Sequence, residues 1–188
     1  MKRRILISLF ACFFFGFAQP ASTQTPSESS KVASAVQAKS PDLNSIEGIV
    51  SATYDAISCP AGKKRNWDRF LLLFYPRARL ILNPASPLLS TAESRVMSPQ
   101  DYIRLWPPVE KKGLLMRSIS NKIEHYRDIA HVFSTYEMRD KADDAQAFQR
   151  GIASFQLFND GKRWYVITML WEGETRENPI PAEYLIGK

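Results

Sequence analysis

Apolar and polar residues alternate with a period of two along most of the second half of the chain. The alternation runs through residues 115–126 and 129–139 and through two further runs within 150–172. Successive side chains of a strand point to opposite faces of a sheet, so this period predicts four strands. Asp160-Gly161 separates the last two runs, and an Asp-Gly pair between apolar runs is a strong hairpin signal. We expect these strands to form an antiparallel meander.

The last hairpin has a definite predicted register if the Asp-Gly pair forms its whole loop. Gln156 then lies opposite Tyr165, and Arg150 lies opposite Trp171. These four residues share one face with Ser154, and the other face carries a run of mostly apolar residues. Because neither face is consistently polar, we expect both faces of the hairpin to be covered.

The first half of the chain has helical spacing instead. Apolar residues recur every three or four positions over 46–57, which predicts an amphipathic helix. Two shorter helices are predicted to begin after the cap residues Asn66 and Ser98, the second with a proline at its first position. A short strand is predicted over 79–82, and a loop or irregular hairpin over 83–97. We therefore predict an α+β domain with three N-terminal helices packed on a curved, mostly antiparallel sheet.

The N-terminal part of the chain has a different composition. Residues 1–18 combine three basic residues with an apolar run of 14 residues, which predicts a secretory signal peptide cleaved before Gln19. An uncleaved anchor is the alternative, but the run is shorter than the roughly 20 residues that span a bilayer. Residues 19–42 are rich in Ser, Ala, Thr, Gln and Pro, which predicts a disordered linker. We expect a folded domain over 43–188, exported to the periplasm or the medium.

Removal of the signal peptide changes the charge and the thiol count. The full chain has a net charge of +6, and loss of the three basic residues lowers it to about +3. This charge gives no reason to expect a nucleic-acid partner. Cys12 leaves with the signal peptide, so Cys59 becomes the only thiol and no internal disulfide is predicted. A buried core thiol and an intermolecular pair are the two readings of Cys59.

Four segments of the domain carry a family resemblance. They are YDAISCPAGKKRNWDRFLLLFYPRARLI (54–81), AHVFSTYE (130–137), RGIASFQLFNDGKRWYVITMLWE (150–172) and NPIPAEYL (178–185). These segments resemble the nuclear transport factor 2-like superfamily, which includes ketosteroid isomerase and the SnoaL-type polyketide cyclases, and in particular a group of secreted bacterial members. The resemblance implies a cone-shaped, cystatin-like fold whose sheet wraps the first helix and leaves a pocket at its open end. It also implies a homodimer through the outer sheet face. The fold hosts isomerases, dehydratases, hydrolases and non-catalytic scaffolds, so it does not by itself name an activity.

Two histidines flank the predicted turn at Arg127-Asp128, and one of them is a candidate base. This turn places Glu124 directly opposite His131, with Cβ atoms about 4.5–5.5 Å apart. The carboxylate would then orient the imidazole for proton transfer. The alternative is an exposed cross-strand pair without chemistry. The isomerase relatives also suggest Tyr136 as a donor to an oxyanion, against the alternative of a core tyrosine.

A second set of residues is a candidate ligand-binding surface. Arg150, Ser154, Gln156, Tyr165 and Trp171 share the predicted hairpin face and would give a mostly apolar pocket a few polar groups. Arg150 opposite Trp171 is either a stacked pair or an anion-binding residue. The sequence contains no Gly-rich phosphate loop and no nucleophile elbow, and no Ser-His-Asp arrangement can be assembled from it. With two histidines and one mature thiol, we predict no metal site and no cofactor.

These patterns lead to one prediction of function and one alternative. We predict an exported domain that binds a small, mostly apolar ligand in its cone pocket, or serves as a dimeric scaffold. It would have no stable membrane anchor after signal cleavage. The alternative is a SnoaL or ketosteroid-isomerase-like enzyme, an isomerase, cyclase or dehydratase. In that enzyme His131 is the base, Glu124 orients it and Tyr136 is the donor.

Overall fold

The computed structural model of the chain describes residues 43–82 and 95–186. The predicted signal peptide (1–18) and linker (19–42) lie outside the described residues. So does most of the stretch for which the sequence predicts a loop or irregular hairpin.

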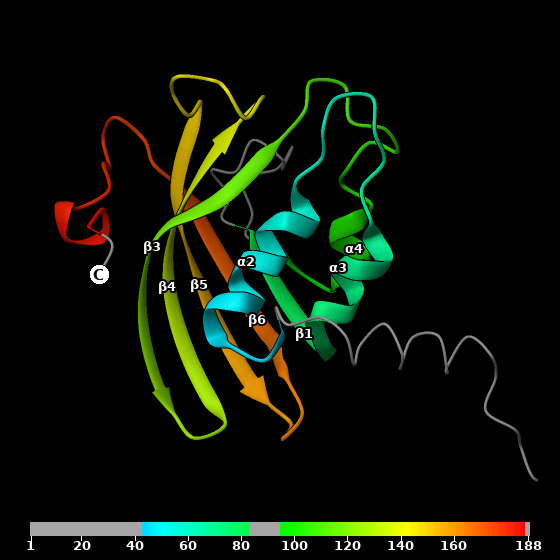
Figure 1. Cartoon of the computed structure of the whole chain (residues 1–188), viewed down its shortest axis with the longest axis vertical. Coiled ribbons are helices and arrows are strands. Elements are labelled where there is room, and N and C mark those ends of the chain that lie inside the picture. Colours follow the sequence, from blue (N-terminus) through cyan, green and yellow to red (C-terminus); the bar gives the residue numbers. More distant parts are fainter. Residues whose placement is uncertain (1–42, 83–94, 187–188) are drawn as a thin grey trace, which may run out of the picture.

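A single curved sheet of six strands forms the body of the domain (Figure 1). In chain order the strands are β1 (Phe74–Leu82), β2 (Arg95–Met97), β3 (Leu115–Tyr126), β4 (Ile129–Arg139), β5 (Gln149–Asn159) and β6 (Trp164–Gly173). Their order in the sheet is β2-β1-β6-β5-β4-β3. Neighbouring strands are antiparallel except for β1 and β6, which are parallel. The α+β class and the antiparallel meander of the last four strands are therefore confirmed.

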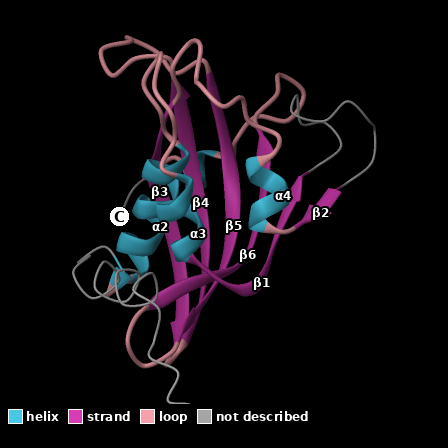
Figure 2. Cartoon of the chain, turned by 90° about the vertical axis from the view of Figure 1, so that its right-hand side faces the viewer, coloured by secondary structure: helices cyan, strands magenta, loops and turns pink. Residues whose placement is uncertain are grey.

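Three α-helices lie against one face of this sheet (Figures 1 and 2). They are α2 (Ile46–Ile57), α3 (Trp67–Leu73) and α4 (Pro99–Ile103), and a short 3₁₀ helix, η2 (Ala182–Tyr184), follows near the C-terminus. Each α-helix begins after a side-chain cap: Ser45, Asn66 and Ser98 accept hydrogen bonds from backbone N–H groups of the first turn. None of the described helices is long and apolar enough to cross a membrane.

The face under α2, α3 and α4, here called the inner face, holds the hydrophobic core. Tyr54 of α2 packs its ring edge-on against Phe155 of β5, with ring centroids 5.8 Å apart. Phe155, Val132 and Val166 are fully buried, as is Leu80 of β1. The core thus joins the longest described helix to the central strands. The opposite side of the sheet is called the outer face.

The hairpin between β5 and β6 has a longer loop than the sequence predicts. Asn159 pairs with Trp164, so the loop comprises residues 160–163 rather than two residues. The Asp160 carboxylate accepts hydrogen bonds from two backbone N–H groups later in the loop. These bonds stabilise the wider loop, and the predicted register of the hairpin was therefore wrong.

A bulge in β6 changes which face its last residues occupy. Ile167 has no partner on β5 because the register shifts at this point. One extra residue reverses the alternation of the side chains beyond it. Trp171 consequently lies opposite Ala153 rather than Arg150, and its ring packs against Tyr102 of α4 at 5.6 Å. The predicted stacking of Arg150 on Trp171 was also wrong.

The strands of the first half are longer than predicted. α3 ends at Leu73, and β1 begins at Phe74, before the predicted strand over 79–82. Phe74 is extended and only 5% exposed, so burial of its ring in the core favours the strand over another turn of helix. β2 lies at the end of a stretch predicted as a loop or irregular hairpin. Its three residues are too few to show a period of two.

Candidate functional site

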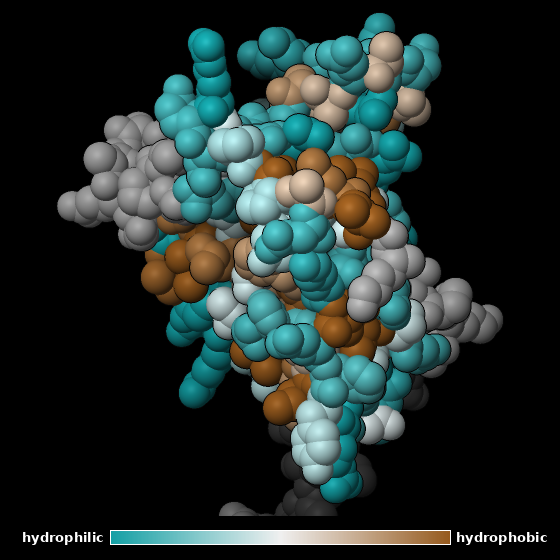
Figure 3. Space-filling view, turned by 90° about the vertical axis from the view of Figure 1, so that its left-hand side faces the viewer, coloured by the Kyte–Doolittle hydropathy of each residue, from teal (hydrophilic) through white to brown (hydrophobic). Residues whose placement is uncertain are grey.

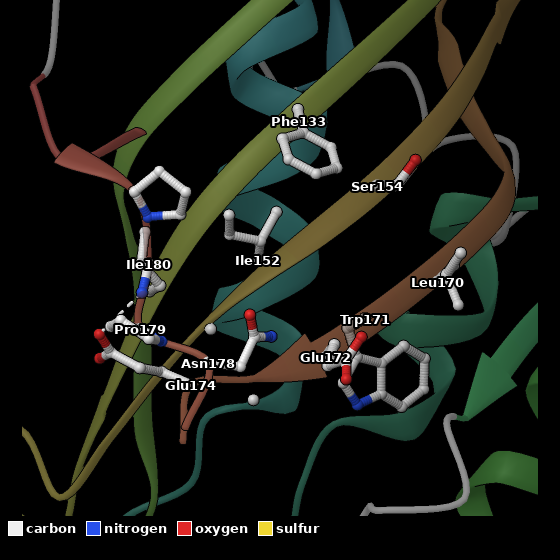
Figure 4. Close-up of a pocket in the computed structure, with 13 residues that line it drawn as sticks. Phe133, Ile152, Ser154, Leu170, Trp171, Glu172, Glu174, Asn178, Pro179 and Ile180 are labelled. Atoms are coloured by element: carbon white, nitrogen blue, oxygen red, sulfur yellow. Dashed lines mark hydrogen bonds between the residues drawn. The ribbon is translucent and has the colours of Figure 1, made fainter. Parts of the chain in front are cut away.

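A cavity of about 420 Å³ lies on the outer face of the sheet (Figure 4). Its floor is formed by side chains of β4, β5 and β6, and one wall by the C-terminal segment 178–181. The floor residues are Phe133, Ile152, Ser154 and Leu170, and Glu172 and Glu174 line one end. We call this cavity the outer groove.

The register of the sheet explains why these floor residues meet. Ser154 of β5 pairs with Phe133 of β4 on one side and with Leu170 of β6 on the other. Directly paired residues project from the same face, so the three side chains form one row across the strands. Ile152 lies two residues before Ser154 and continues the apolar floor. A polar hydroxyl thus lies at the centre of an otherwise apolar row.

The segment that walls the groove is bonded to the sheet through Glu174. Its carboxylate accepts hydrogen bonds from Arg150 Nε (2.8 Å) and Nη2 (3.1 Å) and from the backbone N–H of Ile180 (3.0 Å). Burial disfavours the charged carboxylate, but these bonds outweigh it and hold the pKa of Glu174 below its usual range. Arg150 is therefore engaged by Glu174 at the end of the groove.

The C-terminal segment makes two further contacts with the outer face. The Thr135 hydroxyl donates to the backbone carbonyl of Tyr184 at 2.6 Å. The Tyr184 ring meets Phe133 edge-on, with centroids 5.1 Å apart, and the Lys122 ammonium lies 4.3 Å from its centroid. Together with Glu174, these contacts fix the segment along β3 and β4.

The predicted pairing of Glu124 with His131 is present in the sheet. The two residues are direct partners across β3 and β4, and the hairpin turns at Arg127-Asp128 as expected. His131 Nδ1 lies 4.0 Å from Glu124 Oε2, and the two side chains are 37% and 87% exposed. His131 Nε2 lies 3.1 Å from Ser154 Oγ. Ser154 therefore connects the histidine to the outer groove.

Tyr136 lies on the other side of the sheet. It is 3% exposed, and its hydroxyl donates to the backbone carbonyl of Glu172 at 3.4 Å. Burial, reinforced by the nearby charge of Glu172, raises the pKa of Tyr136 to about 12. The structure does not bring Tyr136 together with His131, because the two side chains project from opposite faces of β4.

The five predicted ligand-binding residues are dispersed. Ser154 and Trp171 line the outer groove, and Arg150 reaches its end through Glu174. Gln156 pairs with His131 across β4 and β5 and is exposed beside the groove. Tyr165 lies at the far end of the sheet, where its ring meets Tyr75 at 5.5 Å. The register of β6 accounts for the displacement of Tyr165 and Trp171, because Tyr165 pairs with Phe158 and Trp171 with Ala153.

Sequence reasoning missed most of the groove. The sequence patterns predict Phe133 and Leu170 only as strand residues, and they assign neither Glu174 nor the segment 178–181 to a site. Their meeting depends on a chain end that folds back over strands far away in sequence, which no local pattern reports. The one available signal was the NPIPAEYL stretch, whose two prolines favour an extended segment.

The described part of the chain shows no candidate metal-binding site. Among residues 43–82 and 95–186, no group of three or more His, Cys, Asp or Glu side chains could hold a metal ion. Cys59 is 2% exposed, which agrees with the prediction of a core thiol.

No protein-family model and no curated protein sequence matches the chain. Several solved structures are similar to it. An NTF2-like protein of unknown function from Shewanella baltica has a TM-score of 0.45 and 11% identity, over 80% of this chain and 99% of that one. A protein of unknown function with a cystatin-like fold from Nostoc punctiforme has a TM-score of 0.45 and 13% identity, over 59% and 78%.

A proposed ketosteroid isomerase from Parabacteroides distasonis is also similar, with a TM-score of 0.44 and 13% identity over 69% of this chain and 93% of that one. The Shewanella baltica protein and two further similar structures, from Methylobacillus flagellatus and Cytophaga hutchinsonii, are described as NTF2-like proteins.

Proposed function

We propose that this domain, exported as its N-terminal sequence predicts, binds a small, mostly apolar ligand in the outer groove. The observation that carries the proposal is the row formed by Phe133, Ser154 and Leu170, apolar at both ends and polar at its centre. The volume of the outer groove, about 420 Å³, lies in the range of about 300–1,000 Å³ typical of ligand pockets. The sequence predicts the ligand inside the cone, but core side chains are packed on the described inner face of the sheet. The ligand site is therefore assigned to the outer face.

The polar groups of the groove restrict the ligand. The Glu172 carboxylate lines the groove and makes no ion pair with any residue in 43–82 or 95–186. Glu174, by contrast, is compensated by Arg150. An apolar ligand with a hydrogen-bond donor or a cationic group at one end would complement this single charge, and an anionic ligand would be repelled.

The test is a binding measurement with a neutral apolar dye such as Nile red on residues 19–188. Leu170→Asp places a charge in the groove floor, and we expect it to weaken binding at least about tenfold. Ile167→Asp is the matched control, because Ile167 lies on the same strand, is 36% exposed against 42% for Leu170, and does not line the groove. Equal losses in the two variants, or no stoichiometric binding by the unchanged protein, would overturn the proposal.

A second candidate function is a dimeric scaffold, and one observation favours it. The groove row continues through Ile81 of β1 to Val96 of β2, because Ile81 pairs with both Leu170 and Val96. Val96 is 61% exposed, and a contiguous apolar row on a surface is typical of interaction sites. Apolar groups also form separate patches among hydrophilic ones on the side that carries η2 (Figure 3). Native mass spectrometry of the same sample separates the candidates by reporting both the oligomer mass and any co-purifying small molecule.

A further inference from the structure

We propose that Ser154 is a nucleophile, activated by His131, that accepts the acyl group of a carboxylic ester bound in the outer groove. This inference rests on the proposed function, because the groove must first hold the apolar acyl chain. It concerns a hydrolytic activity that the sequence did not suggest, since no Ser-His-acid arrangement is visible in the order of the residues.

The central observation is the contact between the two side chains. His131 Nε2 lies 3.1 Å from Ser154 Oγ, a distance at which a neutral imidazole accepts the hydroxyl proton. Both residues belong to interior strands, since β4 is paired with β3 and β5, and β5 with β4 and β6. Strands held on both sides fix side-chain positions more precisely than loops do. The contact is therefore a property of the rigid sheet.

The other ring nitrogen faces a carboxylate. His131 Nδ1 lies 4.0 Å from Glu124 Oε2, and the two residues are direct partners across β3 and β4. A carboxylate on this side favours the tautomer with the proton on Nδ1, which leaves Nε2 free to take the proton of Ser154. Because the Glu124 side chain is 87% exposed, solvent screens it. We assign it as a positioning residue with a small effect.

The position of Ser154 in the groove aligns the nucleophile with an acyl chain. Figure 4 shows its side chain between those of Phe133 and Leu170 on the floor. An acyl chain packed on these apolar groups would bring its carbonyl carbon close to Ser154 Oγ. The row that holds the ligand is thus the row that holds the nucleophile.

The reaction needs only the ester and water. Ser154 Oγ attacks the carbonyl carbon while His131 Nε2 takes the hydroxyl proton. The bond from that carbon to the alkoxy oxygen then breaks, and protonated His131 gives the proton to the departing alcohol. Water attacks the acyl-serine in the same way, releasing the carboxylic acid and restoring the hydroxyl. No electron is transferred to or from another reactant.

The surroundings of Ser154 predict a slow reaction. The backbone N–H groups of β5 serve the two ladders to β4 and β6, so they are not arranged as an oxyanion hole. Loss of one oxyanion donor typically costs about 10²–10³ in rate. We therefore expect turnover only of activated esters, with the acyl-serine accumulating.

The experiment uses p-nitrophenyl butyrate with the protein from residue 19 to 188. We expect a burst of one equivalent of p-nitrophenol and, by intact mass and peptide mapping, one butyryl group on Ser154. Ser154→Ala should abolish both, and His131→Gln should slow acylation at least about 100-fold. Glu124→Gln should slow it only a few-fold. Thr168→Val is the matched control, because it removes a half-buried hydroxyl beside Gln156 that does not line the groove, and it should leave the burst unchanged.

Binding of Nile red to the same variants separates this inference from the proposed function. His131→Gln changes no residue that lines the groove, so it should retain the dye with an affinity within about twofold while slowing the burst. Dye binding by the unchanged protein without acylation of Ser154, or a burst that survives Ser154→Ala, would overturn the nucleophile and leave the binding site standing. Absence of both dye binding and burst would overturn both proposals.

Discussion

The inner and outer faces of the sheet are built from the same strands but follow different rules. On the inner face, neighbouring apolar side chains such as Val132, Phe155 and Val166 are fully buried. On the outer face, Leu170 is 42% exposed and the paired partners His131 and Gln156 are polar. The inner face therefore contributes stability, whereas the outer face leaves side chains available for ligands and chemistry.

Rows of paired residues across the strands give the outer face its order. From the hairpin tips upward they are an apolar row (Ile129, Phe158, Tyr165), a polar row (Glu124, His131, Gln156, Thr168), the groove row (Phe133, Ser154, Leu170, Ile81), a mixed row (Thr135, Ile152, Glu172) and an ionic row (Arg117, Glu137, Arg150). Glu137 in the ionic row also accepts hydrogen bonds from the neighbouring Arg139, which outweigh the effect of burial on its carboxylate. Together with Arg117, these bonds lower the pKa of Glu137. The candidate site lies where the polar row meets the groove row.

The largest contrast between the faces is expected from removal of one large side chain on each. Phe155→Ala empties the centre of the core beside Tyr54 and should lower the free energy of unfolding by about 3–5 kcal/mol. Leu170→Ala, on the exposed outer row, should lower it by less than about 1 kcal/mol. Urea unfolding of the two variants measures the difference. Similar losses would contradict the division of labour between the faces.

A smaller contrast comes from two glycines that pair with each other across β5 and β6. A Cβ at Gly151 would collide with the carbonyl oxygen of Glu172 and the hydroxyl of Tyr136, neither of which can withdraw without moving the sheet or the core. Gly151→Ala should therefore destabilise the domain by about 1–3 kcal/mol. The same thermal or urea transition measures it.

Gly173→Ala is the control for that substitution. Its Cβ would come closest to the end of the flexible Gln149 side chain, at 2.9 Å from Nε2. We expect a change below about 1 kcal/mol. If the two alanine variants unfold alike, the close approach of Tyr136 and Glu172 to Gly151 is not a constraint on the fold.

The sequence predicts the strands of the second half well because one physical signal dominates there. β3 and β4 begin and end where the period of two begins and ends, and Glu124 pairs with His131 as predicted. The β5–β6 hairpin failed because two local events each changed the register. Hydrogen bonds to Asp160 widened the loop, and a bulge at Ile167 reversed the side chains beyond it. Neither event changes the apolar pattern itself.

The site was less predictable than the fold. The Glu124–His131 pair follows from one hairpin, so local reasoning was sufficient for it. The contact of His131 with Ser154 is diagonal between β4 and β5, which are connected by the nine residues 140–148. It depends on the exact register of β4 with β5. The wall of the groove depends on Glu174, whose partners are Arg150 and the backbone of Ile180.

The smallest expected effect concerns that wall. Glu174→Gln keeps the shape of the side chain but removes its charge, and because Arg150 is 41% exposed we expect less than about 1 kcal/mol of global destabilisation. The local effect should be larger: faster amide exchange at Ile180 and faster trypsin cleavage after Arg176. Glu177→Gln is the control, since Glu177 is exposed on the same segment and forms no ion pair with the described residues. It should leave both rates unchanged.

Acid should produce the same release of the wall in the unchanged protein. The folded-state pKa of Glu174 lies below its usual range, so its charged form stabilises the docked segment at neutral pH. That stabilisation is lost as the pH falls through the lowered pKa, below the usual value of about 4.3 for a glutamate. Exchange at Ile180 should therefore differ between the unchanged protein and Glu174→Gln at neutral pH and converge in acid. A difference that persists at low pH would show that the shape of the glutamate, not its charge, holds the segment on the outer face.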